Sequence, residues 1–249
     1  MKLSIVIPAY NEEKYIGKCL ESVFAELKKI KRDVEVVVVD NASTDKTSEV
    51  VKSFVDVKLV YESKKGLSQA RNSGYLASTG EIIANVDSDS EIPEGWIEKV
   101  FVEFEKNPNL VALSGPYLYP EMPKLTNFFI HVYYAIGFVG HIINHHFFKI
   151  GAMLQGGNFI LRRSALQKIN GYDTSIDFYG EDTDIARRIS KVGLVKFMFS
   201  LKMHTSSRRF QDEGIIMTGF RYVINHFWVI IFKKPFTKKF KDIRFAKKV

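Results

Sequence analysis

The residues Ile82-Ile83-Ala84-Asn85-Val86-Asp87-Ser88-Asp89 form an apolar run that ends in two aspartates, two positions apart. Side chains at positions i and i+2 of a strand lie on the same face, so the two carboxylates point to one place. Carboxylates suit Mg²⁺ or Mn²⁺, and these cations bridge the oxygens of a diphosphate. The run therefore predicts a divalent-metal site with a nucleoside diphosphate as its ligand. A short acidic turn on the surface is the alternative.

Short β-branched strands alternate with amphipathic helices up to this run. We expect strands at 3–8, 34–39, 57–61 and 81–86, and helices at 12–29, 46–54 and 67–78. Such alternation is typical of an α/β fold with a mostly parallel sheet flanked by helices. Asn11 is expected to cap the first helix, with Glu12 and Glu13 in its first turn.

Polar residues follow three of these strands, at 8–11, 40–45 and 87–89. Ligands of parallel sheets gather at the carboxyl ends of the strands, so the three loops are expected to form one crevice. No Gly-x-Gly-x-x-Gly motif follows the first strand, and no Gly-x-x-x-x-Gly-Lys-Ser/Thr motif occurs in the sequence. The dinucleotide-binding and P-loop interpretations therefore lose their main support.

The composition is that of a globular protein. With 249 residues, of which 46% are hydrophobic, the chain can bury one substantial core or two small fused subdomains. Its single cysteine, Cys19, excludes disulfides and falls on the apolar face of the first expected helix, so we expect a buried thiol. Residues 1–8 read as a strand without a signal-peptide pattern, which predicts a cytoplasmic catalytic part.

Most of the net charge of +8 lies at the C-terminus, where residues 233–249 hold eight Lys and Arg and one Asp. The apolar and aromatic stretch 220–232 precedes this basic segment. That order favours an anionic membrane surface over nucleic acid as the partner. We expect an amphipathic, basic tail at 216–249 that attaches peripherally at the cytoplasmic face of a membrane.

Further motifs occur in the second half of the chain. Gly156-Gly157-Asn158 and Phe178-Tyr179-Gly180-Glu181-Asp182 are the most distinctive, and the latter begins a helix with acidic residues in its first turn. The positive end of the helix dipole accounts for one or two of these acids, although it does not account for the preceding glycine and aromatics.

Together, six short motifs in register resemble the family 2 glycosyltransferases of the GT-A fold over about residues 3–205. They are Ile7-Pro8-Ala9-Tyr10-Asn11-Glu12, Val38-Val39-Asp40-Asn41-Ala42-Ser43-Thr44-Asp45, Ala70-Arg71-Asn72, Asp87-Ser88-Asp89, Gly156-Gly157-Asn158 and Glu181-Asp182. The resemblance implies a GT-A catalytic domain at 1–215, with a nucleotide-sugar-binding half at 1–115 and an acceptor half at 116–215. It also implies a nucleoside-diphosphate sugar as donor, with UDP favoured and GDP or dTDP possible.

By this resemblance, one group of residues binds the nucleotide sugar. Asp40 is expected at the nucleobase, and Arg71 beside the base or the phosphates, although a lone helix arginine is more often a solvated charge. Gly156, Gly157 and Asn158 bring backbone close to the sugar. The other residues of this group are Pro8, Ala9, Tyr10, Glu12 and Ser88, together with Arg208 and Arg209, for which a basic surface turn is the alternative.

A second group carries the metal and the chemistry. The resemblance implies that Asp89 is the direct ligand of Mn²⁺ or Mg²⁺ and that Asp87 is the ribose or metal-shell aspartate. His204 could complete the site, with a packed or surface imidazole as the alternative. Asp182 is the expected base of an inverting single displacement on a hydroxyl acceptor, a glycan or a lipid-linked glycan, and Glu181 is expected to orient the acceptor or to support the loop.

Residues 125–148 contain no charged side chain, yet a membrane span there would separate the two halves of the site. We expect a helix on the acceptor side instead, and we expect no metal site at His141, His145 and His146. The segment 215–232 is the better membrane candidate, and a homodimer interface is the alternative. A nucleotidyltransferase and a nucleotide-sugar-binding scaffold remain as competing functions.

Overall fold

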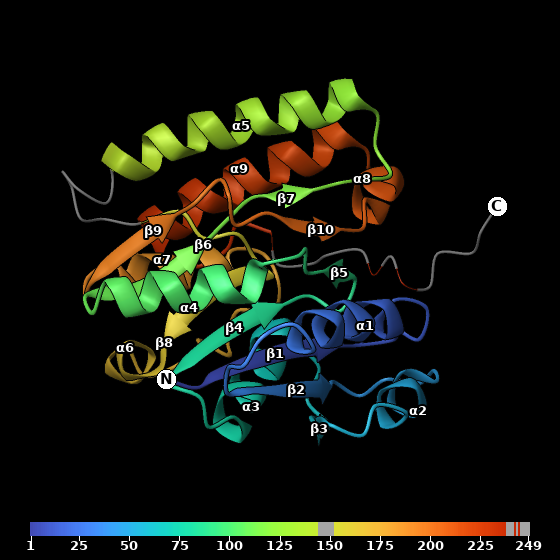
Figure 1. The fold of residues 1–249 in the computed structure, drawn as a ribbon. Helices are drawn as coiled ribbons and strands as arrows, with labels where there is room; N and C mark the ends of the chain where they lie inside the picture. Colours follow the sequence, from blue (N-terminus) through green and yellow to red (C-terminus); the bar gives the residue numbers. More distant parts are fainter. Residues whose placement is uncertain (144–151, 238–241, 243, 245–249) are drawn as a thin grey trace.

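A seven-stranded sheet forms the centre of the computed structural model, which describes residues 1–143, 152–237, 242 and 244 (Figure 1). The strand order is β3-β2-β1-β4-β8-β6-β9. Only β8 runs against its neighbours β4 and β6 within this described sheet, so the predicted mostly parallel α/β sheet is confirmed. The strands are β1 (Leu3–Ala9), β2 (Val34–Asp40), β3 (Val57–Tyr61), β4 (Ile82–Val86), β6 (Leu110–Ser114), β8 (Asn158–Arg162) and β9 (Leu194–Phe197).

Helices cover both faces of this sheet. Each face of the sheet carries its own apolar cluster. Successive side chains of β1 point to opposite faces, so Ile5 and Ile7 belong to one cluster and Val6 belongs to the other. The first cluster includes side chains of α1 (Ile16–Leu27), α2 (Thr47–Lys52) and α4 (Trp96–Lys106). The second includes side chains of α3 (Leu67–Ala77), α6 (Arg163–Lys168) and α7 (Glu181–Ile189). Cys19 is 1% exposed in the first cluster, as expected.

The first helix begins later than the sequence indicates. Its N-cap is Tyr15 rather than Asn11, whose φ of +52° is incompatible with a helix N-cap. The Asn11 side chain instead accepts a hydrogen bond from the backbone N–H of Thr44 at 2.7 Å. The backbone N–H of Glu12 likewise donates to the hydroxyl of Thr47 at 2.8 Å. The cap prediction was therefore wrong, because residues of the 40–47 loop are the hydrogen-bond partners of the Asn11 side chain and of the Glu12 N–H.

A small second sheet lies beyond the carboxyl ends of the central strands. It contains β5 (Ser90–Glu91), β10 (Met203–Thr205) and β7 (Tyr117–Leu118), in that order. Because β5 directly follows Asp89 and pairs with β10, the loop after β10 and α8 (Arg208–Glu213) are held next to the aspartates. This pairing joins segments that are more than a hundred residues apart.

The two predicted halves of the catalytic domain share the central sheet, since β8 lies between β4 and β6. The expected boundary at 216 falls in the first turn of α9 (Ile215–Phe232). This helix is part of the same body, because the rings of Tyr222 and Tyr179 lie 6.0 Å apart between their centroids. Asn225 also exchanges two hydrogen bonds with Thr237 beyond the end of α9, at 2.8 and 2.9 Å.

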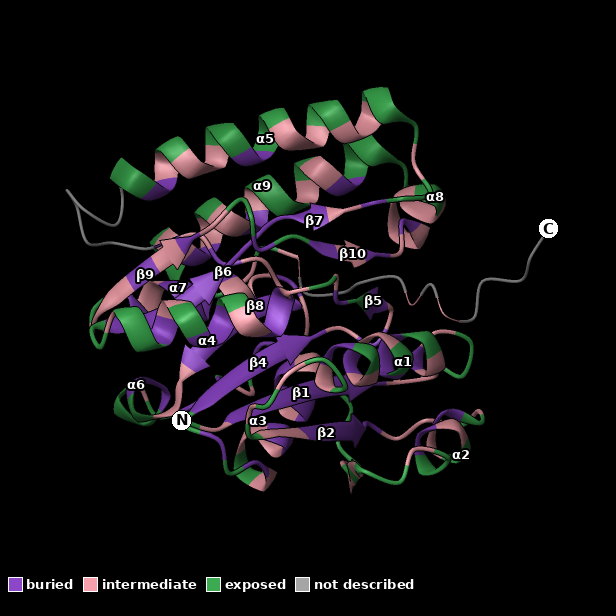
Figure 2. Cartoon of the chain, viewed as in Figure 1, coloured by how far each residue is buried: buried purple, intermediate pink, exposed green. Residues whose placement is uncertain are grey.

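Two helices leave most of their apolar side chains exposed, as the green segments of α5 (Lys124–Ile142) and α9 show (Figure 2). Within the described residues, these are the two helices that are long and apolar enough to cross a membrane by length and composition. Phe129 and Ile136 on α5 and Ile216, Phe220 and Phe227 on α9 are each at least 58% exposed.

The helix expected within 125–148 is therefore present up to Ile142. Its continuation at 144–148, with His145 and His146, lies outside the described residues. His141 is buried and accepts a hydrogen bond from the backbone N–H of Met153 at 3.1 Å.

Candidate active site

Asp87 and Asp89 follow the end of β4, where the sequence predicts the metal site. Both carboxylate oxygens of Asp87 are engaged. Oδ1 lies 3.0 Å from Nη2 of Arg71, and Oδ2 accepts a hydrogen bond from the hydroxyl of Tyr117 at 3.0 Å. Burial and the adjacent Asp87 charge raise the pKa of the Tyr117 hydroxyl, which keeps it a donor. Asp87 is therefore fixed in orientation, whereas Asp89 lines the pocket beside it.

Arg71 is completely buried and connects Asp87 to Glu181 at the start of α7. Burial raises the pKa of Glu181 to about 7, and the Arg71 guanidinium opposes this shift. Arg71 also packs over the ring of Phe159 at 5.0 Å. Arg71 reaches the pocket through Asp87, which lines it. It joins two acidic segments that are far apart in the chain.

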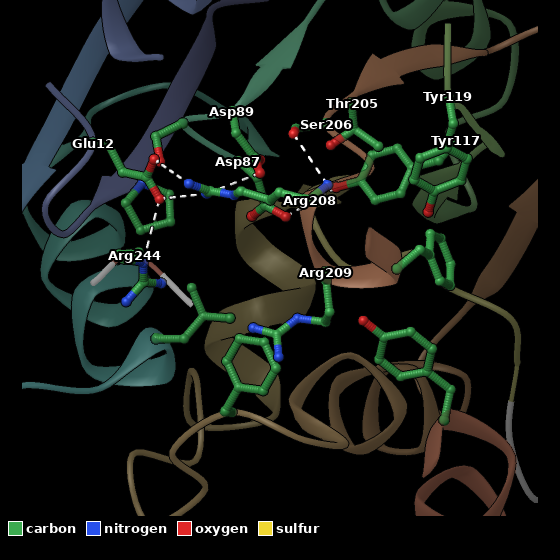
Figure 3. Close-up of a pocket in the computed structure, with 16 residues that line it drawn as sticks. Glu12, Asp87, Asp89, Tyr117, Tyr119, Thr205, Ser206, Arg208, Arg209 and Arg244 are labelled. Carbon is green, nitrogen blue, oxygen red and sulfur yellow. Dashed lines mark hydrogen bonds and ion pairs between the residues drawn. The ribbon is translucent and has the colours of Figure 1, made fainter. Parts of the chain in front are cut away.

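Arg208 lies between Glu12 and Asp89 (Figure 3). Its guanidinium donates to both carboxylate oxygens of Glu12, at 2.8 and 2.5 Å, and its Nη2 atom lies 2.9 Å from Oδ2 of Asp89. Arg244 approaches Glu12 as well, with Nε 3.3 Å from Oε1. Burial raises the pKa values of Glu12 and Asp89, and Arg208 counteracts both shifts. These groups form a paired, largely buried network of charges at one wall of the pocket.

Arg209 lines the same pocket, yet it has different partners. Its Nη1 atom donates to Glu213 at 2.8 Å, and its guanidinium lies over the ring of Phe178 at 4.6 Å. Of the two arginines that the sequence singled out, Arg208 is therefore the one that contacts the acidic residues at the metal site.

His204 does not line this pocket, although its neighbour Thr205 does. Successive side chains of a strand point to opposite faces, so the pairing of Thr205 with Ser90 turns His204 away. In the described part of the chain, no group of three or more His, Cys, Asp or Glu is arranged to hold a metal ion. The structure thus does not bring His204 to the two aspartates of the pocket.

A second pocket adjoins the first and shares Pro8, Ser88, Leu67, Phe178 and Arg244 with it. Ala9 and Tyr10, two of the residues expected to bind the nucleotide sugar, line it. Lys65 donates a 2.5 Å hydrogen bond to the hydroxyl of Tyr10. This pocket therefore has an aromatic ring with a cation next to it.

Asp40 lines neither pocket. Its carboxylate accepts hydrogen bonds from the backbone N–H of Ser43, at 2.9 Å, and from the hydroxyl of Ser48. It orders the turn in which Ala42 has a φ of +60°. The next residue, Asn41, reaches the pocket instead and donates to the carbonyl groups of Glu62 and Lys64.

The loop before β8 lies against both acidic segments. The backbone N–H of Gly156 donates to Oδ2 of Asp182 at 3.2 Å. A Cβ atom on Gly157, which has a φ of +75°, would overlap the Asp87 carboxylate and the Tyr117 hydroxyl. Only glycine fits at position 157, because of this overlap and because of the positive φ.

Asn158 has a structural role in this geometry. Its amide donates to the carbonyl groups of Gly115 and Leu201, each at 2.9 Å, and its oxygen accepts from Trp96 at 3.2 Å. Its side chain is completely buried and holds the loops that surround the site.

Asp182 is half-buried at the start of α7, after Gly180 with its φ of +82°. Its Oδ1 atom accepts a 2.7 Å hydrogen bond from the backbone N–H of Thr183. The hydroxyl of Thr183 lies 3.3 Å from Nδ1 of His226 on α9. Burial lowers the pKa of His226, and Asp182 acts in the opposite direction. The carboxylate therefore lies close to α9.

The sequence interpretation missed several residues of the site. Tyr117 and Tyr119 come from a region without a recognisable motif, and Arg244 comes from the basic tail. Asn41 belongs to the motif at 38–45, in which Asp40 was chosen instead, and Lys65 lies five residues before the motif at 70–72. No local pattern identified His226, because only the packing of α9 brings it to Thr183.

The residues present fit a divalent cation. Mg²⁺ and related ions are commonly bound by one or two carboxylates together with substrate phosphates and water, so a third protein ligand is not required. The Arg208 guanidinium, which is a cation, already contacts Oδ2 of Asp89, the expected metal ligand. Asp87 and Asp89 can therefore hold positive charge in the pocket.

Two family models match the chain. A family model described as Glycosyl transferase family 2 matches residues 4–170. A second model, described as the N-terminal domain of galactosyltransferase, matches residues 141–210. The glycosyltransferase GlyG of Streptococcus pneumoniae is 33% identical over 135 residues, which make up 52% of this chain and 43% of that protein. The chain thus spans less than half the length of this relative.

Solved structures show the same fold. A mannosyltransferase, PcManGT from Pyrobaculum calidifontis in complex with GDP-Man and Mn²⁺, has a TM-score of 0.70 at 20% identity. The match covers 93% of this chain and 63% of that one. TarS residues 1–349 from S. aureus, in complex with UDP-GlcNAc, has a TM-score of 0.64 at 20% identity and covers 96% of this chain and 68% of that one.

Proposed function

The chain belongs to glycosyl transferase family 2, and on this premise we propose that it transfers a sugar from a nucleoside-diphosphate sugar to a hydroxyl acceptor. The reaction is a metal-dependent single displacement that inverts the anomeric carbon. Asp182 is its base and Asp89 is the principal metal ligand. The Arg71 bridge between Asp87 and Glu181 is the observation that carries this proposal, because it couples the aspartates at β4 to the Glu181–Asp182 segment.

The Gly156-Gly157 backbone supports the same reaction. It contacts Asp182 through a hydrogen bond and leaves only enough room for glycine beside Asp87. A sugar bound between these two carboxylates would have its anomeric carbon accessible from the Asp182 side. Preorganised carboxylates at fixed positions are what a displacement of this kind requires.

The displacement breaks the bond from the anomeric carbon to the diphosphate oxygen and forms a bond from that carbon to the acceptor oxygen. Asp182 accepts the proton of the acceptor hydroxyl, because a hydroxyl is a poor nucleophile while it keeps that proton. A hydrogen bond from Thr183 and one from Gly156 orient the Asp182 carboxylate. Glu181, held by Arg71, fixes the start of the helix that carries the base.

Asp87 and Asp89 would hold the divalent cation, Mn²⁺ or Mg²⁺. When bound, such a cation offsets the negative charge that develops on the leaving diphosphate. The complex of PcManGT with GDP-Man and Mn²⁺ supports this assignment through the shared fold. The second pocket, with Tyr10, Asn41 and Lys65, would receive the nucleoside.

The nucleotide of the sugar donor is UDP in this proposal, with GDP and dTDP as alternatives. The Lys65 ammonium lines the nucleoside pocket, and an ammonium group can donate to the carbonyl groups of uracil or thymine. TarS in complex with UDP-GlcNAc is consistent with this choice. The acceptor is a glycan or lipid-linked glycan, since Glu181 and Asp182 are both present for a hydroxyl nucleophile.

We also propose that the enzyme binds peripherally to the cytoplasmic face of a membrane. The exposed apolar side chains of α5 and α9 provide the contact area, and the basic segment 233–249 provides attraction to anionic lipids. The cytoplasmic leaflet carries a negative surface potential that attracts such segments. A homodimer formed through the same helices is the competing outcome.

Thermal unfolding with UDP, GDP and dTDP, each with and without Mn²⁺, tests the sugar-donor site. We expect one nucleotide to raise the unfolding temperature only when Mn²⁺ is present, since a ligand of the native state stabilises it by mass action. The Asp89→Ala variant should lose this response, and the exposed Asp56→Ala variant should keep it. A wild-type protein that none of the nucleotides stabilises would contradict the proposal.

A further inference from the structure

The Arg208 guanidinium occupies the position that positive charge would take beside Asp89. It reaches Oδ2 of Asp89 at 2.9 Å and both oxygens of Glu12 at 2.8 and 2.5 Å. Glu12 is 2% exposed, so its charge requires a partner in the protein. One arginine thus neutralises a buried carboxylate and the expected metal ligand at the same time.

The carboxylates of Glu12 and Asp89 have cationic partners without a metal ion. Arg208 contacts both, and Arg244, which also pairs with Asp242, approaches Glu12. Arg71 is engaged elsewhere, with Asp87 and Glu181. A divalent cation added alone at Asp89 would lie next to the Arg208 guanidinium, and like charges repel strongly in a buried site. A diphosphate added with the cation would offset this repulsion.

We propose that Arg208 alternates between two anionic partners, the carboxylates of Glu12 and Asp89 in the free protein and the diphosphate of the sugar donor when the metal is bound. This inference rests on the function proposed above. The planar fork of a guanidinium binds carboxylates and phosphates equally well, so the exchange replaces one good pairing by another. Arg208 is the first residue of α8, and its side chain is 21% exposed at the pocket.

This exchange makes Arg208 a positioning residue that couples two binding events. In the free protein it competes with the metal for Asp89, and in the complex it holds the phosphates next to that metal. Metal and diphosphate must then strengthen each other's binding, because each removes the obstacle to the other. The wild-type protein should bind Mn²⁺ weakly alone and much more tightly with a diphosphate.

Titration of Mn²⁺ by equilibrium dialysis tests this role in the wild type and in Arg208→Gln, because the excess Mn²⁺ on the protein side counts the ion bound to the protein even when a chelating diphosphate is present on both sides. Pyrophosphate serves as the diphosphate because it needs no nucleobase. Without pyrophosphate, we expect Arg208→Gln to bind Mn²⁺ about tenfold more tightly than the wild type, the scale of close charge pairs. With pyrophosphate, the variant should show a smaller gain in Mn²⁺ affinity than the wild type. The two effects have opposite signs, which a general loss of structure cannot produce.

Arg209→Gln is the matched control, because it removes the same charge from the same pocket but from a pairing with Glu213. It should change Mn²⁺ affinity less than Arg208→Gln does. If Arg208→Gln fails to fold with Glu12 unpaired, the double variant Glu12→Gln/Arg208→Gln replaces it in the same titrations.

Equal or weaker Mn²⁺ binding by Arg208→Gln would overturn the exchange while leaving the sugar-donor site intact. Absence of Mn²⁺ binding by the wild type, with or without pyrophosphate, would instead overturn the metal site and the exchange together. An Asp89→Asn variant that binds Mn²⁺ as the wild type does would have the same meaning, since the cation would then lie elsewhere.

Discussion

The backbone N–H of Gly156 donates a hydrogen bond to Oδ2 of Asp182 over 3.2 Å. This contact holds the carboxylate beside the loop that approaches the sugar, so the base is oriented before an acceptor arrives. We predict that Asp182→Asn lowers kcat by about 10²–10⁴-fold, the usual contribution of a general base. The dissociation constant of the nucleotide should stay unchanged, because Asp182 does not line the nucleoside pocket. A variant with near wild-type turnover would exclude Asp182 as the base.

Arg71 should be essential for stability. Replacement by Met leaves the buried carboxylate of Glu181 and the half-buried carboxylate of Asp87 without their common partner, and breaking a buried ion pair costs about 3–5 kcal/mol. Urea unfolding measures the loss. Arg32→Met is the control, since Arg32 pairs with Glu98 and Glu105 in contact with solvent and should matter much less. A similar loss of unfolding free energy in both variants would show that burial of the Arg71 ion pairs does not determine their contribution to stability.

Gly157→Ala and Gly95→Ala form a matched pair. Both glycines have left-handed backbone, with φ of +75° and +74°, so alanine costs roughly 1–2 kcal/mol of conformational energy at either position. A Cβ atom at Gly157 would overlap Asp87 and Tyr117, whereas one at Gly95 meets no atom within 4 Å. We therefore expect Gly157→Ala to abolish metal-dependent nucleotide binding and Gly95→Ala to retain it. Calorimetric titration measures both.

The buried imidazole of His226 should make the protein less stable in mild acid. Burial lowers the pKa of His226 below its ordinary 6.5, so the unfolded chain binds a proton more readily than the folded one. This contribution to stability is complete above pH 6.5 and is lost as the pH falls toward the folded pKa. Glu181 acts in the opposite direction, because its pKa is raised to about 7.

The comparison with a variant isolates the histidine. We expect His226→Gln to lose less unfolding free energy than the wild type between about pH 7.5 and about pH 5.5. Urea unfolding at both values gives the difference. An unchanged pH dependence would mean that His226 titrates alike in both states.

Exposed side chains of α9 should determine membrane binding. Replacing Ile216, Phe220 and Phe227 by Ser removes apolar contact worth about 1.5–3 kcal/mol per side chain, so partitioning onto anionic vesicles should fall by about tenfold or more per residue. The control replaces Val55 and Leu76, which are 94% and 70% exposed outside α5 and α9. Vesicle flotation measures the bound fraction. A wild-type protein that dimerises and does not float would favour the dimer interface.

The sequence predicted the parts of this fold that depend on local patterns. The strand 82–86 and the two aspartates after it were identified because apolar alternation and the end of a strand are local features. The same reasoning placed α7 after Gly180, whose φ of +82° precedes the acidic first turn.

Pairings between distant segments were beyond such patterns. Arg71 and Glu181 meet only because α3 and α7 cover the same face of the sheet. The direction of His204 follows from its register with β5, and a shift of one residue would turn it toward the pocket. The local pattern predicts Asn11 as a helix cap. Its side chain instead bonds to Thr44, which belongs to another loop and is not part of that pattern. In each case a long-range contact overrides a reasonable local preference.

The position of β8 also affects how the protein is made. β4 is completely buried and pairs along one edge with β8, yet residues 87–157 must be synthesised between them. A nascent chain that has just produced β4 therefore carries an open, apolar strand edge, the kind of surface on which chains associate wrongly. The ribosome must release Asn158–Arg162 before this edge can close. Translation pauses before that point should lower the yield of folded enzyme.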